Sequence, residues 1–153
     1  MIEEKLAALG LSLPVLPRSK GIYKSCLADG NKLYVSGHVS LNTDGTFITG
    51  KVGKDISDED ARLAARQCGL AILSSIKAHL GDLDKIKRVI KILGMVNAVP
   101  EYEHQALVIN GCSELYATLW GEEHGIGVRS AVGMGSLPGN VAVEVEALFE
   151  IHS

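Results

Sequence analysis

The chain has 153 residues, of which 46% are hydrophobic and 22% are charged, with a net charge of −3 at pH 7. These values are typical of one globular domain, and they argue against disordered and fibrous classes. The longest apolar runs in the sequence are too short to span a bilayer. The mildly acidic balance gives no electrostatic attraction to nucleic acids or acidic membranes. The acidic start over residues 1–5 lacks the basic and apolar regions of a secretory signal, so we expect a soluble, cytoplasmic protein.

A short helix and an arm are predicted at the N-terminus. Apolar residues at helical spacing predict a helix over residues 2–9, which Gly10 ends. The proline-containing stretch 13–17 is expected to be extended, because proline disfavours helix at the residue before it. We therefore take residues 1–20 as an N-terminal arm and residues 21–153 as one domain.

A hairpin is predicted next, with strands over residues 22–28 and 32–41 around an Asp-Gly-Asn turn. Residues 46–49 are compatible with a further short strand. Simple alternation in the second strand places the side chains of two sets of residues on opposite faces of the sheet. These sets are Leu33, Val35, Gly37 and Val39 on one face and Tyr34, Ser36, His38 and Ser40 on the other.

The remaining elements follow from capping signals and periodicity. Ser57 and the acidic residues after it resemble a capping box, and Gly81 closes the helix that they start. Strands are predicted over residues 88–98, 128–134 and 141–151, and a second helix over 108–119 that ends near Gly121. Because strands and helices do not alternate strictly, we expect an α+β sheet with both helices on one face. The last strand then carries an apolar face opposite Glu144, Glu146 and Glu150.

No standard catalytic motif occurs in the sequence. The three cysteines (Cys26, Cys68 and Cys112) read as reduced, buried thiols, and the five scattered histidines show no metal-ligand spacing. Arg129 opens a strand, where its guanidinium is either solvated or binds a carboxylate ligand through two parallel hydrogen bonds. Glu144 is either a solvated carboxylate on an edge strand or a group that orients a water in a cleft. The uncovered face of the sheet is, on these patterns alone, either solvated or the seam of an oligomer.

From Arg129 the sequence reads Arg-Ser-Ala-Val-Gly-Met-Gly-Ser-Leu-Pro-Gly-Asn-Val-Ala-Val-Glu-Val-Glu-Ala. This block resembles the signature of the RidA/YjgF family, also called endoribonuclease L-PSP-like, in which an Arg-Ser or Arg-Thr strand leads through a Leu-Pro turn to a Glu-Ile/Val-Glu-Ala strand. Gly-Ile-Tyr at 21–23, Tyr-Val-Ser-Gly at 34–37 and Asn110 match earlier pieces, so the resemblance covers most of residues 21–151. The extended arm resembles a divergent subgroup of that family.

The resemblance implies a chorismate-mutase-like α+β fold, assembled as a homotrimer with ligand clefts between neighbouring subunits. It also implies hydrolysis of enamines and imines, such as 2-aminoacrylate and 2-iminobutanoate, to 2-oxo acids and ammonia, with no metal or organic cofactor. By this analogy Arg129 binds the substrate carboxylate and Glu144 positions the attacking water. The residues implied to line the pocket are Tyr23, Ser36, Gly37 and Asn110.

Several positions depart from the family pattern, namely Ile22, His38, Ser40 and Ala131, and the last of these excludes a thiol role at a place that is often cysteine. These departures leave open a trimer that binds a small carboxylate or regulates without turnover. An endoribonuclease or translation inhibitor is disfavoured, because the basic stretch 85–91 is short and lacks interleaved aromatic residues. A chorismate mutase activity would rest on fold analogy alone.

Overall fold

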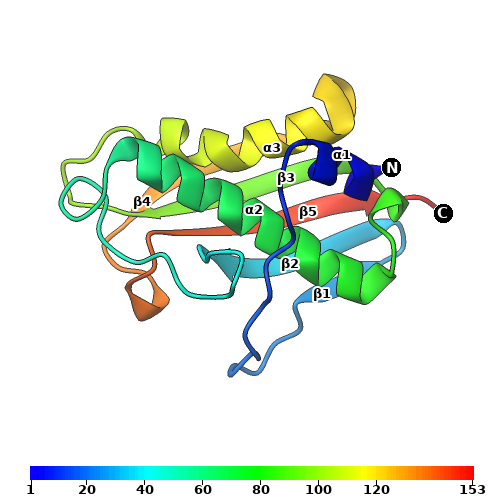
Figure 1. Cartoon of the computed structure of the whole chain (residues 1–153), viewed down its shortest axis with the longest axis horizontal. Coiled ribbons are helices and arrows are strands. Elements are labelled where there is room, and N and C mark those ends of the chain that lie inside the picture. The colour runs from blue at the N-terminus through cyan, green and yellow to red at the C-terminus, as the bar shows by residue number, and fades with distance from the viewer.

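In the computed structural model, which describes residues 1–153, five strands form one mixed sheet in the order β1-β2-β5-β3-β4. The strands are β1 (Cys26–Asp29), β2 (Lys32–Val39), β3 (Ile86–Asn97), β4 (Val128–Met134) and β5 (Val143–Ile151). The helices are α1 (Ile2–Ala8), α2 (Asp58–Leu80) and α3 (Gln105–Gly125), with 3-10 turns at Leu83–Lys85 and Pro138–Asn140. Only β3 and β4 pair in parallel. The long helices α2 and α3 lie side by side across one face of the sheet, which confirms the expected α+β arrangement (Figure 1).

Helix α2 begins and ends where its capping residues predict. The Ser57 hydroxyl accepts a hydrogen bond from the Asp60 amide at 3.1 Å, and Gly81 takes up the left-handed conformation with φ +85°. Small residues on the inner stripe of α2 allow α3 to approach closely. A side-chain atom on Gly111 of α3 would overlap the Arg62 carbonyl of α2.

Strand β5 lies in the middle of the sheet, paired with β2 on one side and β3 on the other. Its apolar residues Val143, Val145, Ala147 and Phe149 are buried under the helices. Its glutamates lie on the opposite, uncovered face, as the alternation predicts. The alternative of Glu144 on an edge strand is therefore wrong.

A β-bulge in β2 overturns part of the predicted alternation. The pairing with β5 shifts between Val35 and His38, so two residues are accommodated where the regular ladder has one. His38 consequently faces α2 and is 9% exposed, while Val39 pairs with Glu144. The prediction that His38 shares the outer face with Tyr34 is wrong, because the bulge reverses the alternation after Val35.

Three segment boundaries also differ from the sequence prediction. Residues 22–25 lie outside β1 in an exposed loop, because the ladder with β2 begins only at Cys26. Residues 46–49 form isolated bridges rather than a strand. Helix α3 begins at Gln105, three residues before the predicted start, and its geometry is interrupted at Gly121, which has φ 78°.

The N-terminal arm runs across α2 before it reaches the sheet (Figure 1). Ile2 and Leu6 of α1 join the hydrophobic core. Farther along, the Ser74 hydroxyl of α2 donates a hydrogen bond to the Pro14 carbonyl at 2.9 Å. Residues 17–25 then project from the molecule as an exposed loop that leads into β1.

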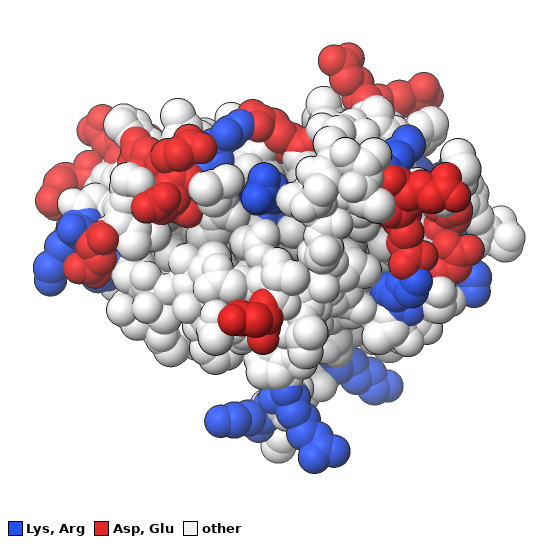
Figure 2. All heavy atoms as spheres, viewed as in Figure 1, with Lys and Arg blue, Asp and Glu red and all other residues white.

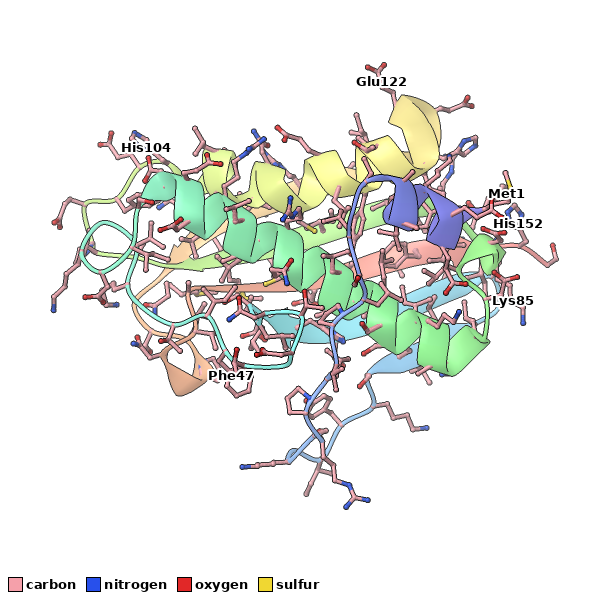
Figure 3. The ribbon with its side chains drawn as sticks, viewed as in Figure 1. Met1, Phe47, Lys85, His104, Glu122 and His152 are labelled. Atoms are coloured by element: carbon pink, nitrogen blue, oxygen red, sulfur yellow. The ribbon has the colours of Figure 1, made fainter.

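None of the helices combines the length and the apolar character that a membrane span requires. No three side chains among histidine, cysteine, aspartate and glutamate are grouped so that they could hold a metal ion. Two of the histidines, His104 and His152, lie at opposite ends of the molecule (Figure 3).

Candidate functional site

Arg129 lies on β4 and turns toward α3. Its Nη1 donates a hydrogen bond to the Ser113 hydroxyl at 3.1 Å, and its Nη2 reaches the Ala106 carbonyl at 3.4 Å. The side chain is exposed and forms no ion pair with any carboxylate of the chain. Its fork of donors is therefore oriented by neutral partners while its charge stays free for an anionic ligand.

Asn110 lies beside this guanidinium. Ala106, Asn110 and Ser113 are spaced at i, i+4 and i+7 on α3, so they form one stripe on the helix surface. Arg129 contacts the first and the last of the three, which places Asn110 between its two contact points. We call Arg129, Asn110 and Ser113 the arginine half-site. Asn110 sits in the second turn of α3, which begins at Gln105.

Glu144 lies on the uncovered face of β5, with its carboxylate over Gly37 of β2. A side-chain atom on Gly37 would be 3.1 Å from the carboxyl carbon of Glu144 and would overlap Oε2. Glycine at position 37 therefore makes room for the carboxylate. Burial raises the pKa of Glu144 above its ordinary value, and the nearby charge of Glu146 adds to the shift. A carboxylate whose pKa is raised is a stronger base than an ordinary glutamate, which suits it to accept a proton from water.

Tyr23 joins this second group of residues, which we call the glutamate half-site (Tyr23, Gly37 and Glu144). Tyr23 and Gly37 line a cavity of about 930 Å³ beside the end of β2. Ser36 lines a separate cavity of about 730 Å³ on the uncovered face of the sheet. The Ser36 hydroxyl donates a hydrogen bond to the Lys24 carbonyl at 2.5 Å. Its donor is thus used to tie the projecting loop to β2.

The two half-sites of one chain lie on opposite faces of the sheet. Across β3, Arg129 is level with Ile92 and Glu144 is level with Met95. Arg129 and Glu144 are thus two strands and three residue positions apart, which corresponds to about 14 Å between their Cα atoms. Because side chains alternate along a strand, an offset of three positions places these two side chains on opposite faces of the sheet. A single chain therefore cannot bring Arg129 and Glu144 to the same small molecule.

His38 is a polar residue near the site whose setting the sequence did not predict. Its Nδ1 is 2.6 Å from the Ser36 carbonyl, and its Nε2 is 2.7 Å from the Ser75 hydroxyl. Because a carbonyl only accepts hydrogen bonds, Nδ1 carries the proton and Nε2 accepts from Ser75. Burial lowers the pKa of His38, against the bond to Ser36, so the neutral ring is favoured. The ring thus clamps the bulge that carries Gly37, and the interior glycine itself was the sequence signal for that bulge.

The cysteines supply no nucleophile to either half-site. All three are free and buried, as the sequence predicts. Burial raises the pKa of the Cys26 thiol to about 11 and that of Cys112 to about 12. The thiols therefore stay protonated and act as small core residues.

Comparison with known proteins places this geometry in context. The model of the family described as Endoribonuclease L-PSP matches residues 15–151. Protein TCP17 of Trypanosoma cruzi is 39% identical over 152 residues, which span 99% of this chain and 95% of that protein.

Solved structures resemble the chain to two different degrees. The protein Atu1372 of Agrobacterium tumefaciens, described as having unknown function, is 46% identical, with a TM-score of 0.90 over 99% of this chain and 94% of its own. RidA of an Antarctic Psychrobacter is 22% identical, with a TM-score of 0.59 over 89% of this chain and 94% of its own, and thus shares the fold. Since the match to Atu1372 spans nearly the whole chain, the N-terminal arm is part of what those two proteins share.

Proposed function

Because the chain belongs to the endoribonuclease L-PSP family, the RidA/YjgF proteins, we propose that it hydrolyses reactive 2-imino and 2-enamino acids to 2-oxo acids and ammonia. Two features support this proposal. Arg129 is an exposed cation without a carboxylate partner, and Glu144 is a half-buried carboxylate with a raised pKa. The first suits the carboxylate of a small acid, and the second suits a water that must lose a proton.

The chemistry asks little of the protein beyond orientation. Protonation converts an enamine to its iminium form, in which C2 is electrophilic. Water adds to C2 and gives a proton to Glu144, and the proton returns to nitrogen as ammonium leaves: the iminium and one water yield the 2-oxo acid and one ammonium ion. Arg129 fixes the substrate carboxylate, Asn110 binds beside it, and Tyr23 and Gly37 shape the space around C2. Holding both reactants in place supplies the acceleration.

The complete site requires two copies of the chain, and we propose that each cleft of a homotrimer combines the arginine half-site of one subunit with the glutamate half-site of the next. The location of the two half-sites on opposite faces of the sheet supports this assembly. So does the exposure of apolar side chains on the uncovered face, where Leu27, Tyr34 and Val132 are 52%, 49% and 37% exposed.

Complementation between two inactive variants tests the activity and the shared site together. Arg129→Ala and Glu144→Gln are each expected to lose the acceleration of 2-aminoacrylate and 2-iminobutanoate hydrolysis, with the imines generated in situ by a dehydratase. When equal amounts are unfolded and refolded together, each cleft receives both intact residues with probability one half times one half. The mixture should therefore recover about a quarter of wild-type activity in any cyclic assembly.

Other outcomes would change the conclusion in distinct ways. If the refolded mixture of the two variants is folded but stays inactive while the wild type is active, the shared cleft is contradicted. A folded wild type that accelerates no imine, yet binds 2-oxobutanoate in calorimetry through Arg129, would favour a binding or regulatory trimer without turnover. The same measurement with Arg129→Ala shows whether the guanidinium is the group that holds the carboxylate.

A further inference from the structure

The cavity of about 930 Å³ is built from the N-terminal arm as well as from the domain. The arm contributes one wall through residues 14–19, α2 contributes another, and the end of β2 closes the third side. Gly37 lies in that third side, directly under the Glu144 carboxylate. Glu144 itself does not line the cavity, so Gly37 is the residue that the cavity and the glutamate half-site share. The volume is far more than a three- or four-carbon acid fills, and it falls within the range of sites for larger ligands.

The charge of this cavity is opposite to that of the chain as a whole. The chain carries 18 acidic residues and a net charge of −3, but no aspartate or glutamate lines the cavity. Its ionisable lining residues are Lys24, His38 and His79, besides Tyr23 and Cys26. Arg18 and Lys20 lie on the same exposed loop as Lys24, and positive side chains gather at the projecting tip in the space-filling view (Figure 2). None of these three basic side chains forms an ion pair within the chain.

Hydrogen-bond donors in the cavity are also left without partners. Ser74 donates to the arm, and Ser75 donates to His38, so both hydroxyl protons are used. Lys24 Nζ and the Ser25 hydroxyl, by contrast, make no hydrogen bond to the protein. A lining that offers free donors and a positive charge, with no competing carboxylate, fits an anionic group.

Resting on the proposed deaminase function, we propose that this cavity binds a second carboxylate of the substrate, so that the preferred substrates are 2-imino acids whose side chain ends in a carboxylate. Arg129 of one subunit holds the carboxylate on C2, Glu144 of the next acts at C2, and Lys24 with Ser25 holds the distal carboxylate. The reaction is unchanged: water adds to C2 and ammonium leaves, while the distal carboxylate takes no part in the chemistry. The arm, which forms the outer wall, then determines substrate length.

The test compares imines that differ only in the distal group. An amino-acid oxidase with catalase generates 2-iminopropanoate from alanine, 2-iminosuccinate from aspartate and 2-iminoglutarate from glutamate. We expect a higher kcat/KM for the dicarboxylic imines in the wild type. In Lys24→Gln the ratio of dicarboxylic to monocarboxylic kcat/KM should fall about tenfold, the effect of losing one charge-assisted hydrogen bond. Lys54→Gln, which removes an exposed lysine away from the cavity, is the matched control and should keep the wild-type ratio.

Failure of this inference can be told apart from failure of the proposed function. Acceleration of all imines without a dicarboxylic preference, or a ratio that Lys24→Gln does not change, would overturn the second carboxylate site and leave the deaminase standing. If no imine is accelerated, calorimetry decides instead. Tighter binding of 2-oxoglutarate than of 2-oxobutanoate, weakened by Lys24→Gln, would support the site, and equal binding would overturn it.

Discussion

Replacing Gly37 with alanine should separate the catalytic use of Glu144 from its part in the fold. The added methyl group would lie 3.1 Å from the Glu144 carboxyl carbon and overlap Oε2. That oxygen must therefore retreat by about 1 Å, a displacement that costs roughly 10²-fold in rate when it misplaces a catalytic group. The carboxylate is the free end of a flexible side chain, and Gly37 has no left-handed backbone. We therefore expect the free energy of unfolding to change by less than about 1 kcal/mol.

The assay for Gly37→Ala follows 2-oxo acid release from 2-aminoacrylate above the rate in buffer, beside a denaturant titration of each protein. Gly135→Ala is the matched control, because an added methyl group there has no heavy atom within 4 Å and the backbone is not left-handed. A Gly37→Ala protein that is folded and as fast as the wild type would refute the placement of a catalytic carboxylate over Gly37.

Three further changes test electrostatics and packing. Burial raises the pKa of Glu144 in the folded state, so the ionised carboxylate destabilises the fold. Glu144→Gln should therefore raise Tm at about pH 7. This gain in Tm should disappear as the pH falls through the raised pKa of the folded state towards 4.5, the ordinary pKa of the group. Burial lowers the pKa of His38, so the wild type should lose stability as the pH falls below 6.5. His38→Gln should show less of that loss in the same fluorimetric scans, and an identical pH profile would contradict the buried neutral ring. Gly111→Ala drives a methyl group into the Arg62 carbonyl and should cost about 1–3 kcal/mol in denaturant titration. An unchanged midpoint would contradict the close contact of α2 with α3.

The sequence predicts correctly the elements in which the spacing of apolar residues stays the same from end to end. Helix α2 has a capping serine, a regular apolar stripe and a closing glycine, and its bounds agree with the prediction. Strand β5 alternates without interruption, and its buried and exposed sides agree as well. Strand β2 does not keep one period, because the bulge reverses the side chains after Val35. Alternation cannot predict such a reversal, although the interior Gly37 hinted at it.

The candidate site could be predicted as a set of residues but not as an arrangement. Arg129 and Glu144 stand in one short block of sequence, which suggests neighbours in space. In the fold, β3 separates their strands and the register turns them to opposite faces. Strand order and register arise from pairings between distant segments, so no local pattern reports them. The same holds for the arm, whose contact with Ser74 creates one wall of the large cavity.

The central position of β5 has a consequence for how the molecule forms. The hairpin of β1 and β2 and the pair of β3 and β4 share no ladder with each other, and only β5, the last strand in chain order, joins them. Its side chain Glu150 meets Asn31 across 119 positions of sequence. Bringing such distant segments together costs conformational entropy before the strands have formed their stabilising contacts, and this cost slows folding. During synthesis the earlier segments must therefore wait with apolar faces uncovered until β5 emerges, and this interval is when the chain is most exposed to aggregation and to chaperones.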